Sequence, residues 1–307
     1  MKRFAAITAS VVMIVIAIII RSNLDSNGSS GGGGGGGGST SGPVTIACVT
    51  ELADQCNALQ NVTVRVEDAA ITAKAIANGN ADIDGWVTFE PWPEIANQLA
   101  GRAVTGDSAR LAASPLVIAM VQERAAAFAP ACGGSVNWHC LGDAIDKQWT
   151  EVGGRQDWGA VKAGLPPVSS GAGLLLLGNA ASGYFGRTDF ATNDFDADFT
   201  GWRSKVTAAK DASFANFLLR FPAAFSAVGT IAAQADAGAR ASEVVFLGPP
   251  PSASAVAVLA QVSSNRAQGR AADLRKALQA ARWEADVPAS NGLPNAGVLL
   301  ALSGLTG

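Results

Sequence analysis

The run from Phe4 to Ile20 contains no charged residue and is rich in Ile, Val and Ala. Its 17 residues lie near the lower limit for a helix that crosses a bilayer core, about 17–25 residues. Lys2 and Arg3 precede the run, and no small-x-small cleavage site follows Ile20 directly. The run therefore predicts a cytoplasmic stub at 1–3 and an uncleaved transmembrane anchor at 4–20. Cleavage further on, among the Ser and Gly residues, is the alternative.

The segment behind the predicted anchor, residues 21–43, holds eight consecutive glycines from Gly31 to Gly38. It has almost no apolar side chain to bury, so it cannot offset the entropy lost on ordering, and it predicts a flexible linker. The folded part is then 44–307, long enough for two lobes with sizeable cores. Because the basic residues of the stub favour the cytoplasmic side, this part is expected on the extracytoplasmic side of the cell membrane.

The four cysteines form two local pairs, each with a sequence separation of eight: Cys48 with Cys56, and Cys132 with Cys140. In an oxidising compartment this pattern predicts two disulfides, although four cysteines allow three connectivities. A zinc site with His139 beside Cys140 is the alternative. Because neither pair has the short spacing of structural zinc sites, we expect disulfides and no metal.

Short apolar strands alternate with amphipathic helices along the folded part. This order predicts an α/β fold with a largely parallel sheet. The first lobe is expected at about 44–121 with part of the C-terminal region, and the second at about 122–240. Ser114-Pro115 is expected to interrupt a strand at 111–121. The other predicted strands are 44–49, 62–66, 83–87, 243–247 and 255–262, and the predicted helices are 51–59, 69–77, 92–99, 122–129, 171–185, 214–220, 231–237 and 271–283.

The order and spacing of several segments resemble type 2 periplasmic solute-binding proteins, such as the molybdate, sulfate and phosphate receptors. More closely, the chain resembles the binding-protein-like domains of actinobacterial surface proteins, which a von Willebrand A domain often follows. The resemblance covers 44–307 and rests on Val44–Ala47 with Thr50–Leu52, Asp84–Val87 with Trp92, Ala113–Ala119, Val168–Leu174 and Phe225–Thr230.

This resemblance implies two α/β lobes, each with a mostly parallel sheet, joined by two crossing strands, with a ligand held in the cleft. An Arg after the serine turn, which an oxyanion receptor might have, is absent, and Glu51 and Asp84 would repel an anion, so the ligand class stays open. The residues that the resemblance places at the ligand are Thr50, Glu51, Asp84, Trp86, Ser114, Ser169, Ser170, Gly171, Gly229 and Thr230.

Each of these positions has a plainer interpretation. Ser170 can simply cap a helix, Trp86 can belong to the core, and Asp84-Gly85 can form a turn. A further acidic run superficially resembles a calcium loop, but it lacks the glycine and the distal Glu of an EF-hand, so a solvated turn is expected. This run consists of Asn193, Asp194, Asp196 and Asp198.

No enzyme motif lies in the folded part, so we expect neither catalysis nor a cofactor. Three of the 22 basic residues and one of the 25 acidic residues precede Gly42, so the remainder carries a net charge of about −5, which argues against nucleic acid. The first hypothesis is a membrane-tethered binding protein that captures a small polar solute, with a transporter permease or another surface protein as partner. The alternative is a cell-surface interaction or scaffold module that keeps the fold without a small ligand.

Overall fold

The computed structural model describes residues 43–209, 212–220, 224–235 and 243–305. The predicted stub, anchor and linker up to residue 42 lie outside these residues. Pro43–Gly307 forms one compact unit. No helix within the described ranges is long and apolar enough to cross a bilayer, so the anchor at 4–20 stays a prediction.

The unit is built on a mixed sheet in the order β2-β1-β3-β8-β4-β6-β5, with β7 also paired to β4. Three of its strand pairings are parallel and four are antiparallel. The prediction of a largely parallel sheet was therefore wrong, because β8 inserts antiparallel between β3 and β4. The strands are β1 (Val44–Val49), β2 (Val62–Glu67), β3 (Gly85–Phe89), β4 (Ser108–Val121), β5 (Ala163–Gly164), β6 (Ala227–Ile231), β7 (Val244–Leu247) and β8 (Ser254–Gln261).

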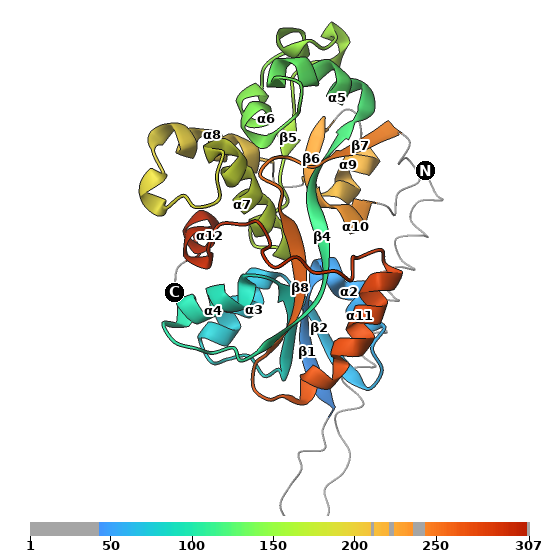
Figure 1. Ribbon diagram of the computed structural model, residues 1–307, viewed down its shortest axis with the longest axis vertical. Coiled ribbons are helices and arrows are strands. Elements are labelled where there is room, and N and C mark those ends of the chain that lie inside the picture. Colours follow the sequence, from blue (N-terminus) through green and yellow to red (C-terminus); the bar gives the residue numbers. More distant parts are fainter. Residues whose placement is uncertain (1–42, 210–211, 221–223, 236–242, 306–307) are drawn as a thin grey trace, which may run out of the picture. The chain divides into compact units, whose positions relative to one another are not determined.

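The long strand β4 belongs to both lobes and runs between them (Figure 1). Its first part, as far as Pro115, pairs with β8, and from Leu116 onward it pairs with β6 and β7. The predicted interruption at Ser114-Pro115 is absent, since the strand is continuous over its 14 residues. Pro115 is tolerated where the strand changes partners. We call the part with β1–β3 and β8 the first lobe, and the part with β5–β7 the second lobe.

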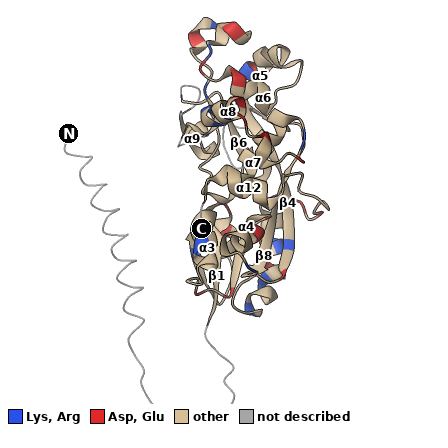
Figure 2. Cartoon of the chain, turned by 90° about the vertical axis from the view of Figure 1, so that its left-hand side faces the viewer, with Lys and Arg blue, Asp and Glu red and all other residues tan. Residues whose placement is uncertain are grey.

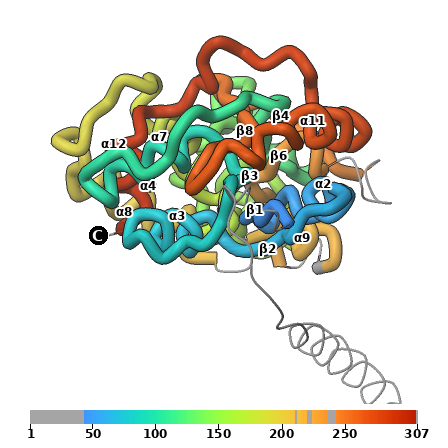
Figure 3. The backbone as a smooth tube through the Cα atoms, turned by 90° about the horizontal axis from the view of Figure 1, so that it is seen from below, coloured from blue at the N-terminus to red at the C-terminus, as the bar shows by residue number. Residues whose placement is uncertain are grey.

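Helices cover both faces of the first-lobe sheet. Figures 1 and 3 show α3 (Ala69–Ala77) and α4 (Trp92–Ala100) on one side, with α2 (Ala53–Asn57) and α11 (Ala271–Ala280) on the other. This two-sided cover explains why the strands between them are largely apolar. The second lobe carries α5 (Gln122–Phe128), α6 (Trp138–Ala144), α7 (Gly171–Phe185), α8 (Ala197–Thr207), α9 (Phe214–Arg220) and α10 (Ala232–Ala235).

The C-terminal helix α12 (Ala296–Ser303) packs against α4 of the first lobe and α7 of the second. It begins at Asn295, whose side chain accepts a hydrogen bond from the Val298 N–H at 3.1 Å. This helix was not predicted, because its short and almost wholly apolar sequence shows no amphipathic period.

Both predicted disulfides are confirmed. Cys48–Cys56 joins the end of β1 to α2, and both of its residues are 0% exposed. Cys132–Cys140 joins the end of η2 (Ala129–Cys132) to α6 and is partly exposed. The described residues contain no free cysteine.

Basic and acidic residues are interspersed along the ribbon in Figure 2, and the view shows no long basic stretch.

Candidate functional site

The N-terminus of α7 lies where the two lobes meet. Ser170 caps the helix, since its hydroxyl accepts a hydrogen bond from the Gly173 N–H at 3.0 Å. The Ala172 N–H donates instead to Oε1 of Glu51, at 2.7 Å. Glu51 belongs to η1 (Thr50–Leu52) of the first lobe. A carboxylate of the protein thus occupies the positive end of a 15-residue helix.

Further hydrogen bonds join the lobes around this contact. The Trp92 indole N–H donates to the Gly171 carbonyl at 3.0 Å. The Ser169 hydroxyl donates to Asp68 at 3.2 Å, and the Ser169 carbonyl accepts from the Ala70 N–H at 3.0 Å. We call this set, Glu51, Ser169, Ser170, Gly171 and Ala172 with their partners, the α7 junction.

The junction is packed closely at Gly171. A Cβ at this position would lie 2.9 Å from the Glu51 carboxylate and 3.0 Å from the Phe89 ring. Gln234, at the end of α10, donates its side-chain N–H to the Glu51 carbonyl at 3.2 Å. Glu51 is therefore held by a helix N-terminus through its carboxylate and by a glutamine through its backbone.

Four other predicted residues lie at the crossing or beside the junction. The Ser114 hydroxyl accepts from the Ala233 N–H at 2.9 Å, and Thr230 on β6 is 3% exposed. Gly229 is packed against Leu165, Trp138 and Leu176, so a side chain would not fit there. Thr50 is exposed and donates to Glu51 at 3.2 Å.

The structure does not bring Asp84 and Trp86 to the junction. Asp84 precedes β3, at the opposite end of the strand from Phe89, and accepts hydrogen bonds from the Thr45 N–H at 2.9 Å and the Ser264 hydroxyl at 2.6 Å. Trp86 is wholly buried in the core, and its indole N–H has no partner among the described residues. We therefore leave both out of the candidate site.

Burial would by itself raise the pKa of the Asp84 carboxyl. The hydrogen bonds from Ser264 and Thr45 and the charge of Arg266, 3.8 Å away, outweigh burial and hold this pKa below its ordinary value. Asp84 therefore ties the start of β1 to the residues that follow β8, and its role in the structure is to hold the first lobe together.

Because the folded-state pKa is the lower one, the Asp84 carboxylate stabilises the protein above the unfolded pKa of about 3.9. This stabilisation is lost as the pH falls through the folded value. We expect Asp84→Asn to lower the free energy of unfolding by about 1–2 kcal/mol at pH 7, with the difference from wild type shrinking as the pH falls below the unfolded pKa of about 3.9. Urea denaturation across this range measures it, and a difference that is independent of pH would contradict the assignment.

The acidic run behind α7 behaves as ordinary surface structure. Asp196 caps α8 by accepting from the Phe199 N–H at 2.8 Å, and Asp194 pairs with Arg187 at 2.9 Å. No cluster of His, Cys, Asp and Glu that could hold a metal occurs in the part of the chain that the structure describes. His139 stacks on Tyr184 and pairs with Asp143 at 3.5 Å.

Four of the junction residues were not among the predicted ligand residues, namely Asp68, Trp92, Ala172 and Gln234. Trp92 carried a partial signal, because it stands at a predicted helix start next to two prolines. Asp68 stands directly before a predicted helix, a position that by itself suggests a cap. Gln234 gave no signal, since its partner is 183 positions away.

The sequence matches no protein-family model and no curated protein. Solved structures are similar only at a distance, and the resemblance to actinobacterial surface proteins stays a prediction. A mutant of OxyR from Corynebacterium glutamicum has 10% identity and a TM-score of 0.49, with 89% of this chain and 72% of that chain covered. The OxyR2 regulatory domain from Vibrio vulnificus has 13% identity and a TM-score of 0.49 over 81% and 100% of the two chains. The sulfate-binding protein SubI from Mycobacterium tuberculosis has 17% identity and a TM-score of 0.48 over 81% and 88%.

Likenesses this distant carry no conclusion about function. The mixed sheet and the helices that cover it establish the α/β architecture.

Proposed function

We propose that the folded unit binds a small polar molecule that offers a carboxylate-like group to the N-terminus of α7, between the two lobes. The observation that carries this proposal is the 2.7 Å hydrogen bond from the Ala172 N–H to Glu51. A first-turn N–H that already holds a carboxylate can hold that of a ligand in the same way. The ligand's group takes the place of Glu51, so the two negative charges do not compete for one position.

Displacement of Glu51 is physically accessible. Its side chain is only half-buried, and its neighbour Thr50 is exposed. The apparent affinity is lowered by the fraction of molecules in which Glu51 occupies the position, since only the vacated state can bind. Removing the Glu51 carboxylate should therefore raise the affinity for a ligand.

The proposal also covers location. The apolar run at 4–20 and the glycine-rich segment behind it support a unit tethered to the cell membrane on its extracytoplasmic side. A transporter permease or another surface protein is the partner that fits this placement. The proposal includes no catalytic step.

The test is thermal unfolding of the full-length chain against amino acids, small carboxylates, sulfate, sugars and polyamines. A compound that binds only the folded state raises its stability by about 2.7 kcal/mol at a hundredfold excess over Kd. We expect a carboxylate compound to bind Glu51→Ala at least about tenfold more tightly than wild type, a difference of about 1.4 kcal/mol. Asp273→Ala, which removes an exposed carboxylate on α11 and leaves Glu51 in place, is the control and should bind like wild type.

A second candidate function is an interaction module without a small ligand. It is favoured by the pairing of the predicted polar residues within the protein itself: Ser114 with Ala233, Ser169 with Asp68, and Glu51 with Ala172. The first proposal is rejected in favour of this one if wild type and Glu51→Ala both melt cooperatively and no compound raises the melting temperature of either.

A further inference from the structure

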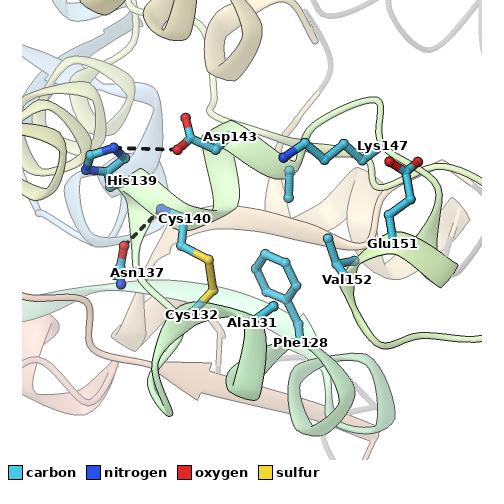
Figure 4. Close-up of a pocket in the computed structure, with 11 residues that line it drawn as sticks. Phe128, Ala131, Cys132, Asn137, His139, Cys140, Asp143, Lys147, Glu151 and Val152 are labelled. Carbon is cyan, nitrogen blue, oxygen red and sulfur yellow. Dashed lines mark hydrogen bonds and ion pairs between the residues drawn. A yellow bond between two sulfur atoms is a disulfide. The ribbon is translucent and has the colours of Figure 1, made fainter.

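The second lobe contains a cavity of about 520 Å³ that lies apart from the α7 junction. The Cys132–Cys140 disulfide and the Phe128 ring form part of its wall (Figure 4). His139, Asp143 and Lys147 also line it, and in Figure 4 Asp143 stands between the other two. A disulfide that borders a cavity is accessible to a small reagent from solution.

The two disulfides of this chain differ in the accessibility of their sulfur atoms. Cys48 and Cys56 are both 0% exposed and belong to the main core. Cys132 and Cys140 are both partly exposed. The rate of thiol–disulfide exchange depends on access to the sulfur atoms. A small thiol can therefore reach Cys132–Cys140, whereas the core excludes it from Cys48–Cys56.

Among the residues that line the cavity, Lys147 carries a positive charge and Asp143 and Glu151 carry negative charges. Lys147 is exposed and has no ion pair among the described residues, whereas His139 pairs with Asp143 at 3.5 Å. A nearby cation stabilises a thiolate relative to a thiol. Glu151, the other acidic residue on the wall, is engaged through Oε1 by the Gln148 N–H at 2.8 Å.

We infer that this cavity is an exchange site at which a low-molecular-weight thiol reacts with the Cys132–Cys140 disulfide. The incoming thiolate attacks one cysteine sulfur and forms a mixed disulfide with it. The Cys132–Cys140 bond breaks, and its electron pair remains on the other cysteine as a thiolate, which Lys147 stabilises. A second thiolate then attacks the small-thiol sulfur of the mixed disulfide. The bond between that sulfur and the cysteine breaks, the oxidised dimer of the small thiol leaves, and the remaining cysteine is released as a thiolate. The thiol is the reductant in both steps.

The exchange links the cavity to the packing of the second lobe. The disulfide closes the loop between η2 and α6, and this loop leads into Trp138, which is 0% exposed and packs against Gly183 and Gly229. Thiol modification therefore releases a constraint next to a buried anchor of α6.

The experiment exposes the full-length oxidised chain to glutathione, stops the reaction with acid, and quantifies each modified cysteine by peptide mass spectrometry. We expect Cys132 and Cys140 to react at least about tenfold faster than Cys48 and Cys56, because the latter react only after the core opens. Equal rates for the two pairs would overturn the inference.

A matched pair of variants tests the cavity itself rather than exposure alone. Ala131→Trp places a bulky ring on an exposed position of the cavity wall, and Ala272→Trp places the same ring on an exposed position of α11. The first should slow the reaction of Cys132–Cys140 by about fivefold or more because access is blocked, and the second should leave it unchanged. An unchanged rate in folded Ala131→Trp speaks against the exchange site.

If Ala131→Trp does not fold, Lys147→Gln tests the cavity instead. Lys147 is exposed, and its replacement disturbs no ion pair among the described residues. Loss of the cation should slow modification of Cys132–Cys140 by about threefold, with no change at Cys48–Cys56. The same rate as in wild type would count against the role of Lys147 and of the cavity.

Discussion

Replacing Cys48 and Cys56 together by alanine is expected to lower the free energy of unfolding by about 4 kcal/mol. A disulfide that closes a loop of this length restricts the unfolded chain by about 2–3 kcal/mol. Both sulfurs are also wholly buried between β1 and α2, so their removal leaves a cavity that costs roughly 1–2 kcal/mol more. Guanidinium denaturation followed by tryptophan fluorescence measures the loss.

The second disulfide supplies a matched control, because its sequence separation is also eight. The chain-entropy effect is therefore the same in both double variants. Replacing Cys132 and Cys140 by alanine should cost only about 2–3 kcal/mol, since these sulfurs are partly exposed and leave little cavity. Equal losses in the two double variants would show that burial of the first pair contributes nothing.

Gly173→Ala is expected to cost about 3 kcal/mol. A Cβ at this position would collide with the Pro167 carbonyl, which belongs to the turn that leads into α7. Because backbone on both sides is fixed in the core, the collision cannot be relieved by turning a side chain, and overpacking of this kind costs about 1–3 kcal/mol or more. Thermal unfolding of the full-length variant measures the effect.

Gly201→Ala is the control for this substitution. Gly201 lies inside α8 and is exposed, and a Cβ added there would meet no atom within 4 Å. Alanine there should stabilise the protein by about 0.5–1 kcal/mol through helix propensity. A loss of stability at Gly173 no larger than about 0.5 kcal/mol would contradict the close packing at the start of α7.

Local features of this fold were predictable from the sequence. Ser170 and the small residues behind it predicted a helix over 171–185, and α7 has these bounds. The cap depends on residues within one turn, so the pattern that predicts it is present in the local sequence. The two disulfides were predictable for the same reason, since each pair is separated by eight residues.

Long-range pairings were not predictable in this way. The insertion of β8 between β3 and β4 makes the central strand pairings antiparallel. The residue pattern of β8 alone does not indicate which strands it pairs with. Asp84 illustrates the consequence for the site. It was predicted inside a strand at 83–87, but β3 begins at Gly85, so its carboxylate lies at the far end of the sheet from Glu51.

Four of the residues that the resemblance placed at a ligand, Glu51, Ser169, Ser170 and Gly171, meet at the α7 junction. Their contact with a ligand stays a prediction. The hydrogen bond from Ala172 to Glu51 joins residues 121 positions apart, and only the folded arrangement shows that the Glu51 carboxylate occupies the N-terminus of α7.

The position of Pro115 on β4 has a mechanical consequence. Here the strand leaves β8 and begins to pair with β6 and β7. Because proline has no backbone N–H, twisting the strand at this residue stretches no donor bond of the ladder. We expect a rotation of one lobe against the other to concentrate at this residue, as at a torsional pivot, while the pairings on either side stay intact. The α7 junction and α12, which contact both lobes, would oppose such a rotation.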